Sequence, residues 1–84
     1  MTTESKRIRV EYYAQFRERR KSPGEEIATS AATAIEFYRE LDARHPFGVS
    51  PAQVRIALNG KLVPWETAIT DGDTVVFLTP FGGG

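Results

Sequence analysis

One stretch of the chain has the clear pattern of an amphipathic helix, and a single helix must find a sheet or another layer on which to bury its apolar face. In the segment TAIEFYRELDARHP, Thr33 and Glu36 have the spacing of a capping box. In that motif the threonine hydroxyl accepts from the N3 amide, and the glutamate reaches back to the amide of the cap residue. The pattern predicts a helix at 34–44, stopped by Pro46 and Gly48, with one apolar face formed by Ala34, Phe37, Tyr38 and Leu41.

Alternating apolar and polar residues predict strands on both sides of this helix. RIRVEYYA places Ile8, Val10 and Tyr12 on one face, and a weaker pattern follows the turn signal SPGE. Asn59-Gly60 is a strong hairpin signal because both residues tolerate positive φ. The turn TDGD precedes the last strand, and Pro80 ends it. The expected strands lie at 6–13 and 25–31, through Val54, Ile56 and Leu58, at Leu62 and Val63, and at 74–79.

The order of these elements predicts an α+β domain of two layers, with one main helix packed on one face of a mixed sheet of about five strands. A first hairpin, a crossing helix and a last strand that returns beside the first describe a β-grasp arrangement. We expect residues 1–79 to form this domain and residues 80–84 to form a flexible C-terminal Gly-Gly tail. The core is expected to contain Ile8, Val10, Phe37, Leu41, Ile56, Leu58, Val75 and Phe77.

Composition excludes several classes of protein. The 84 residues carry 11 basic and 11 acidic side chains, and this balance argues against nucleic acid as a partner. The basic segments KRIR and RERRK indicate a solvated face, or alternatively an electrostatic docking patch. The absence of cysteine excludes disulfides and thiolate chemistry and fits a cytoplasmic protein. MTTESKR has no apolar core of a signal peptide, and no apolar run approaches the ~20 residues that span a membrane.

The side chains do not form a catalytic or metal-binding pattern. His45 is the only histidine and follows the helix, where it suits the negative end of the helix dipole better than a metal. Glu25-Glu26 and the Asp71…Asp73 pair are interpreted as turn chemistry rather than as acid–base pairs. Trp65 is expected to cover an edge of the core, with ligand stacking as the less favoured alternative. No intrinsic cofactor and no metal site is predicted.

An exposed apolar surface is predicted beside the C-terminal tail. Strand parity turns Tyr13 outward on the first strand and Val76 and Leu78 outward on the last, and Leu62 follows the hairpin turn. If the first and last strands are neighbours, these side chains form one contiguous patch. A patch of this kind favours a surface for a protein partner over scattered exposed residues.

Four segments together resemble the MoaD/ThiS family of ubiquitin-like sulfur carriers, and in particular the molybdopterin synthase small subunit. They are RIRVEYYAQFRE, TAIEFYRELDARHP, ALNGKLV and TDGDTVVFLTPFGGG, and the resemblance extends from about residue 7 to the last residue. The most specific features are YAQFRE and the Gly-Gly that ends the chain a few residues after the last strand. The resemblance implies a ubiquitin-like β-grasp fold.

The resemblance also implies a chemistry for the tail. In this family an ATP-dependent E1-like adenylyltransferase of the MoeB/ThiF type activates the terminal carboxylate, and sulfur then replaces AMP to give a thiocarboxylate. Gly84 would carry the sulfur and Gly83 would precede it. The implied acceptor is a molybdopterin synthase large subunit of the MoaE type. The implied docking residues are Tyr13, Leu62, Leu78, Phe81 and Gly82.

The resemblance leaves the pathway open. YAQFRE favours molybdenum cofactor biosynthesis, and the extended helix and the loop from His45 to Gln53 make the chain longer than is usual for a thiamin-type carrier. Carriers for cysteine, thiamin, siderophore or tRNA thiolation remain alternatives, as does a ubiquitin-like modifier that forms isopeptide bonds to lysine. The carrier itself is expected to be no enzyme, since catalysis resides in its partners, and ATP is used by the activating enzyme.

Overall fold

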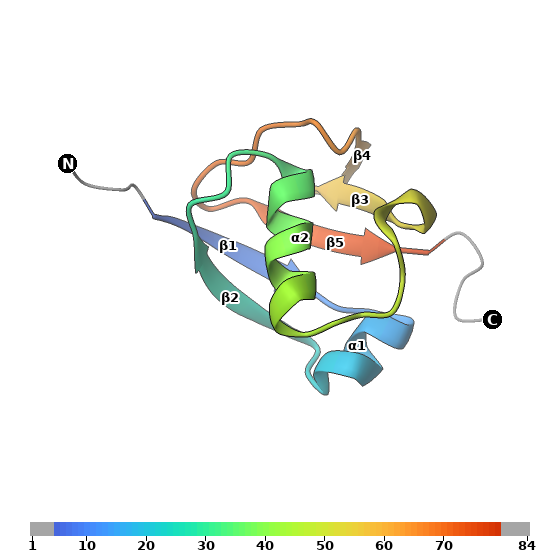
Figure 1. The fold of residues 1–84 in the computed structure, drawn as a ribbon. Helices are drawn as coiled ribbons and strands as arrows, with labels where there is room; N and C mark the ends of the chain where they lie inside the picture. Colours follow the sequence, from blue (N-terminus) through green and yellow to red (C-terminus); the bar gives the residue numbers. More distant parts are fainter. Residues whose placement is uncertain (1–4, 80–84) are drawn as a thin grey trace.

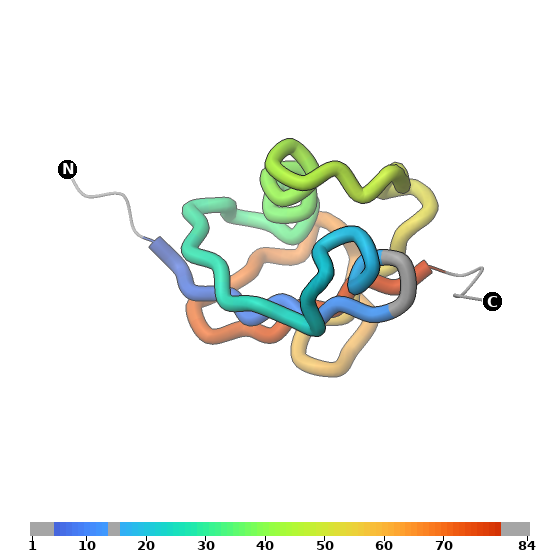
Figure 2. The backbone as a smooth tube through the Cα atoms, turned by 90° about the horizontal axis from the view of Figure 1, so that it is seen from below, coloured from blue at the N-terminus to red at the C-terminus, as the bar shows by residue number. Residues whose placement is uncertain are grey.

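A five-stranded mixed sheet carries one long helix on one face (Figures 1 and 2). The computed structural model describes residues 5–79, apart from the side chains of Ala14 and Gln15. The strand order is β2-β1-β5-β3-β4, with β1 parallel to β5 and the other neighbours antiparallel. The bounds are Lys6–Glu11 for β1, Gly24–Thr29 for β2, Arg55–Leu58 for β3, Lys61–Val63 for β4 and Thr74–Leu78 for β5.

This arrangement confirms the predicted β-grasp fold. The first and last strands are neighbours, as the prediction of a joint surface required. β1 ends at Glu11, two residues earlier than expected. β2 begins one residue before the predicted start at 25 and ends two residues before the predicted end at 31. The tail at 80–84 lies outside the described residues, so the predicted boundary between domain and tail stays a prediction.

Helix α2 (Ala34–Arg44) has the bounds that the sequence predicts. The Thr33 hydroxyl accepts from the Glu36 amide at 3.4 Å, which is the expected cap. The Glu36 carboxylate accepts from the amide of Ala32 at 2.9 Å, one residue before the expected cap amide. Both bonds give a partner to backbone amides at the start of the helix, where no carbonyl of the helix can accept from them. At the other end, the His45 amide donates to the Leu41 carbonyl at 2.8 Å.

A second helix, α1 (Ala14–Arg20), was not predicted. It has no side-chain cap at Tyr13, and it ends at Lys21 in the left-handed conformation with φ 56°, without the glycine that usually marks such an end. Its apolar contribution rests on Phe16, which is fully buried and packs edge-on against Phe47 with ring centroids 5.1 Å apart. A short 3-10 helix, η1 (Pro51–Gln53), precedes β3 and was also not predicted.

The core lies between α2 and the inner face of the sheet. Seven of the eight predicted core residues are buried, whereas Leu58 is only half-buried and packs at the margin. Phe77 is central among the aromatic side chains, with its ring 5.0 Å from Tyr38 and 5.8 Å from Phe16. Trp65 packs on this cluster and donates its indole N–H to the Pro51 carbonyl at 3.2 Å, so it covers an edge of the core as predicted.

The hairpin turn is tied to the start of β5. Asn59 and Gly60 have φ values of 52° and 88°, as the Asn-Gly pair predicts. Asn59 donates from its side-chain amide to the Asp73 carboxylate at 2.9 Å and accepts from the Thr74 amide at 2.9 Å. Asp73 also accepts from the Thr70 amide at 2.7 Å, so this carboxylate is used in turn structure, as expected.

These bonds determine how Asp73 responds to pH. Burial alone would raise the pKa of Asp73, but the hydrogen bonds from Asn59 and Thr70 outweigh it and hold the pKa below the ordinary value of 3.8. The unfolded chain therefore binds a proton at a higher pH than the folded chain does. The stabilisation by charged Asp73 is fully present above the unfolded pKa and is lost as the pH falls through the folded pKa.

Candidate functional site

The face of the sheet opposite α2 has an apolar centre. Tyr13 is 49% exposed, Leu62 62% and Leu78 38%, and these are the large apolar side chains that are exposed among the described residues. Val76 is half-buried between them. The prediction that these side chains turn outward is confirmed. We call Tyr13, Leu62, Val76 and Leu78 the open-face patch.

The strand register explains why these residues meet. Val76 of β5 lies opposite Ala57 of β3, and Ala57 lies opposite Leu62 of β4, so the three side chains share one row across the sheet. Leu78 lies two residues farther along β5 on the same face, opposite Arg55. Ala57 is 8% exposed, which leaves the larger side chains on either side of it to form the surface.

Tyr13 reaches this face although it lies beyond the end of β1. Its backbone is extended, with φ −131° and ψ 158°, and it is the residue before α1. Its hydroxyl donates to the Glu11 carboxylate at 3.3 Å, which places the ring beside a residue that is paired with Val76. The helix that follows, which the sequence did not predict, begins at the next residue.

The open-face patch adjoins the point from which the tail leaves. β1 and β5 run in parallel and end on the same side of the molecule, where α1 also lies (Figure 1). Leu78 is the last residue of β5, one residue before the end of the described chain at Thr79. The other predicted site residues, Phe81, Gly82, Gly83 and Gly84, lie outside the described residues.

Charged side chains border the patch. Arg55 lies opposite Leu78, and Glu11 lies beside Val76 in the row of paired residues. A mixed border around an apolar centre is the usual composition of a protein–protein interface.

Between residues 5 and 79, no group of three or more His, Asp or Glu side chains could hold a metal ion. No helix in the same range is long and apolar enough to cross a membrane.

One carboxylate has a different role from the one predicted. Glu25 was interpreted as turn chemistry, but it lies in β2 and accepts from the buried Tyr12 hydroxyl at 2.7 Å. Arg20 of α1 donates to the same oxygen from Nε at 2.9 Å and from a terminal nitrogen at 2.7 Å. Burial would raise the pKa of Glu25, but the bonds from Tyr12 and Arg20 outweigh it and lower the pKa. These contacts join α1 to the sheet through one oxygen of this carboxylate.

Burial raises the pKa of Tyr12, and the hydrogen bond to Glu25 raises it further, whereas Arg20 lowers it by a smaller amount. Burial and the charge of Asp42 raise the pKa of Tyr38 to about 12, and its hydroxyl donates to the Val49 carbonyl at 2.7 Å. Both hydroxyls therefore stay protonated near neutral pH and serve as hydrogen-bond donors in the core. Neither acts as a base or nucleophile in this arrangement.

Comparison with known proteins identifies the family. A family model described as the ThiS family matches residues 10–84. The chain belongs to the ThiS family. This confirms the resemblance found in the sequence, and the chain is therefore a sulfur carrier of the ThiS and MoaD type or a small modifier with the same fold. Carriers of this family are non-catalytic small subunits.

Individual relatives agree with this assignment. The chain is 30% identical over 80 residues to the molybdopterin synthase sulfur carrier subunit of Escherichia coli, which covers 92% of this chain and 99% of the relative. It is 30% identical to a solved structure from Pyrococcus furiosus, a putative molybdopterin converting factor subunit 1, with a TM-score of 0.75 over 90% of this chain and 99% of the other.

Two structures with lower identity show the shared fold alone. The small archaeal modifier protein 1 of Methanosarcina acetivorans is 20% identical, with a TM-score of 0.77 over 96% of this chain and 99% of the other. A Helicobacter pylori structure is a complex of subunits 1 and 2 of molybdopterin-converting factor. Its matching chain is 24% identical, with a TM-score of 0.63 over 93% of this chain and 99% of that chain.

Proposed function

We propose that this chain is the sulfur carrier subunit of a molybdopterin synthase. The observation that carries the proposal is the 30% identity to a molybdopterin synthase sulfur carrier subunit over 99% of that protein's length. The family model also extends to Gly84, so the Gly-Gly segment belongs to the part that matches the family. The Pyrococcus furiosus structure, named as a putative molybdopterin converting factor subunit, supports the same pathway.

The terminal carboxylate of Gly84 is the reacting group in this proposal. A carboxylate is a poor electrophile, so a separate enzyme of the E1-like type transfers AMP from ATP to its oxygen and releases pyrophosphate. A sulfur nucleophile at the oxidation level of hydrosulfide then attacks the acyl carbon, and AMP leaves with the oxygen. The product is a thiocarboxylate at Gly84. ATP is a substrate of the activating enzyme and not a cofactor of this chain.

Sulfur transfer returns the chain to its starting state. The thiocarboxylate sulfur adds to an electrophilic carbonyl carbon of the pterin precursor on the large subunit, and the carbonyl oxygen takes the electron pair of the broken π bond and a proton. Water then cleaves the bond between the acyl carbon and sulfur, which leaves the sulfur on the precursor and restores the carboxylate of Gly84. Gly83 and Gly84 suit this cycle because a backbone without side chains can enter two different narrow active sites. The absence of cysteine in the sequence fits as well, since the sulfur is brought to the chain as a modification.

Docking in this proposal uses the open-face patch together with Phe81 and Gly82. The patch is exposed, apolar and adjacent to the end of β5, so a partner that covers it also receives the tail. The Helicobacter pylori complex of two molybdopterin-converting factor subunits supports a large subunit as the partner. The activating enzyme would use the same surface at a different time.

The pathway is tested by reconstitution. The thiocarboxylated chain is mixed with a molybdopterin synthase large subunit and the sulfur-free pterin precursor, and molybdopterin is measured by fluorescence of its oxidised product. We expect conversion with the complete chain and none after deletion of Gly84, whereas deletion of Thr2 serves as a matched control and retains conversion. Conversion by the variant without Gly84, which ends in the carboxylate of Gly83, would exclude a requirement for Gly84 itself.

A protein modifier is the second candidate, favoured by the shared fold with the small archaeal modifier protein of Methanosarcina acetivorans. In that case the activated carboxyl of Gly84 would form an isopeptide bond with a lysine amine. Mass spectrometry of proteins bonded to the chain separates the two functions. Loaded chain that fails to convert the pterin precursor but forms isopeptide adducts would favour the modifier.

A further inference from the structure

The second edge of the sheet, far from the open-face patch, has backbone groups that no other strand uses. β2 is an edge strand, paired only with β1. The Tyr12 amide donates to the carbonyl of its partner residue Pro23 at 2.9 Å, which fixes the alternation of bonded pairs along the two strands. By this alternation the backbone of β2 bonds to β1 at Glu25, Ile27 and Thr29. The amides and carbonyls of Glu26 and Ala28 therefore point outward.

Only one end of this edge is capped. The Ser22 hydroxyl donates to the Gly24 carbonyl at 2.8 Å and accepts from the Gly24 amide at 3.3 Å. Within residues 5–79, the outward groups of Glu26 and Ala28 have no hydrogen-bond partner. Both residues are exposed. A row of free donors and acceptors at strand spacing is complementary to one kind of ligand, an extended backbone.

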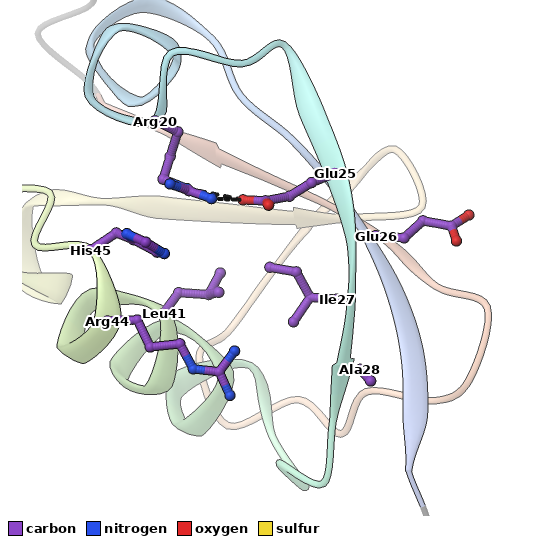
Figure 3. Close-up of a pocket in the computed structure, with 8 residues that line it drawn as sticks. All are labelled: Arg20, Glu25, Glu26, Ile27, Ala28, Leu41, Arg44 and His45. Carbon is purple, nitrogen blue, oxygen red and sulfur yellow. Dashed lines mark hydrogen bonds and ion pairs between the residues drawn. The ribbon is translucent and has the colours of Figure 1, made fainter.

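A cleft lies beside this edge, between β2 and α2 (Figure 3). It has a volume of about 310 Å³. Ile27 and Leu41 face each other across it, while the side chains of Glu26 and Ala28 point away from α2 (Figure 3). These two residues therefore border the cleft with their backbone. A strand added to β2 would turn every second side chain into this cleft.

The charged groups of the cleft indicate which side chains fit. At one end, one oxygen of Glu25 accepts from both Arg20 and Tyr12, and Arg20 balances the charge of this carboxylate. On α2, Arg44 donates to Glu40 at 2.9 Å, but its side chain is 56% exposed and other N–H groups of its guanidinium remain accessible. His45 is exposed next to it. The apolar lining by Ile27 and Leu41 suits an apolar side chain, and Arg44 suits a carboxylate.

We propose that the β2 edge binds an extended segment of a partner protein, which adds a sixth strand to the sheet. The segment has a β-branched apolar residue that enters the cleft and an acidic residue two positions away that meets Arg44. This surface is separate from the open-face patch, because β1 and β5 lie between β2 and β3. The interaction is independent of sulfur loading and does not rest on the proposed pathway.

A second copy of this chain suits the edge less well. Antiparallel pairing of two β2 edges in one continuous sheet places both α2 helices on the same side. Arg44 of each copy would then face the cleft of the other copy, with His45 beside it. Two guanidinium groups brought together in this way repel each other, whereas a peptide carboxylate is attracted.

The test uses the unloaded, ¹⁵N-labelled full chain and a defined probe. The probe is a capped peptide of about ten residues that alternates threonine and valine, with one aspartate two positions from the central valine. We expect the amide resonances of Glu26 and Ala28 to shift and to become protected from exchange. A matched peptide, N-methylated at the amides that would face β2, is expected to bind at least about tenfold more weakly than one methylated at the alternate amides.

Protein variants test the same contacts. Ala28→Pro removes an outward amide without removing a bond to β1, and an edge strand tolerates proline at such a position. We expect Ala28→Pro to weaken binding of the probe peptide at least about tenfold, and Arg44→Glu to do the same. Arg39→Glu makes the same charge change on the exposed side of α2 and should change the affinity by no more than about twofold. The methylated peptides decide the matter if Ala28→Pro does not fold.

Three results would overturn the proposal. The first is no resonance shift at millimolar peptide. The second is shifts confined to Leu62, Val76 and Leu78, which would place the peptide on the open-face patch. The third is self-association of the chain without peptide that Ala28→Pro abolishes, which would make a second copy the occupant of the edge.

Discussion

Leu62→Asp is expected to weaken binding of the sulfur-accepting partner while leaving the fold intact. Leu62 lies in β4 at the margin of the open-face patch and is 62% exposed, so the fold itself gains little from it. Complete burial of a leucine is worth about 1.5–3 kcal/mol, and covering the exposed part is therefore worth about 1–2 kcal/mol. Its loss corresponds to about five- to thirtyfold in the dissociation constant.

The carboxylate adds a further cost, because a partner that covers Leu62 would have to remove water from the charge. The total effect is expected to be tenfold or more, measured by titration calorimetry against the molybdopterin synthase large subunit. Ala43→Asp places the same carboxylate on the exposed surface of α2, on the opposite layer, and should bind as the unaltered chain does. Thermal unfolding confirms that both variants fold. Unchanged affinity for folded Leu62→Asp would refute the assignment of the open-face patch.

Three further predictions concern stability. Asp73→Asn should reduce the loss of stability that the protein shows below about pH 4, because the stabilisation by the charged carboxylate is lost there. Urea unfolding at pH 7, 5 and 3 measures this, and an unchanged pH profile of stability would contradict it. Thr33→Ala should lower the free energy of unfolding by about 0.5–2 kcal/mol through loss of the cap of α2, and no change in the urea midpoint would remove that role. Phe77→Ala should lower the free energy of unfolding by about 3–5 kcal/mol, measured by urea unfolding with Trp65 fluorescence as the probe. A loss under about 1 kcal/mol would mean that the aromatic cluster is not the centre of the core.

The parts of the fold that the sequence predicted are those with local signals. Helix α2 has a capping pair at one end and a proline beyond the other, and both bounds agree with the structure. The Asn59-Gly60 turn requires positive φ at two residues, which few other pairs tolerate. The outward position of Leu78 follows from strand parity alone.

Helix α1 could not be predicted in the same way because its stability comes from distant residues. Among its described side chains, Phe16 is the one large side chain that is buried, so no periodic pattern arises. Phe16 packs on Phe47 and Phe77, which come from a loop and from the last strand. The burial of Phe47 was missed for the same reason, since a loop has no period from which its inner face can be inferred.

The role of Glu25 shows the same limit. Adjacent glutamates after a turn signal suggested turn chemistry, but Glu25 accepts from Tyr12 and Arg20, which lie on other elements. The separation between residues 12 and 25 in the sequence gives no sign of this contact. The outward positions of Val76 and Leu78 were easier to predict, because strand parity requires only that β5 forms. The residues beyond Thr79 lie outside the described part, so their role in docking stays a prediction.

The central claim is that Gly84 carries sulfur, and intact-mass spectrometry tests it most directly. The full chain is incubated with an E1-like activating enzyme, ATP and a sulfur donor, and release of pyrophosphate confirms that the enzyme is active. We predict a mass gain that equals replacement of one oxygen by one sulfur, located at Gly84 by fragmentation and absent when ATP is omitted. Pyrophosphate release and adenylation of Gly84 without this gain, or a gain that fragmentation places on another residue of the full chain, would contradict the claim.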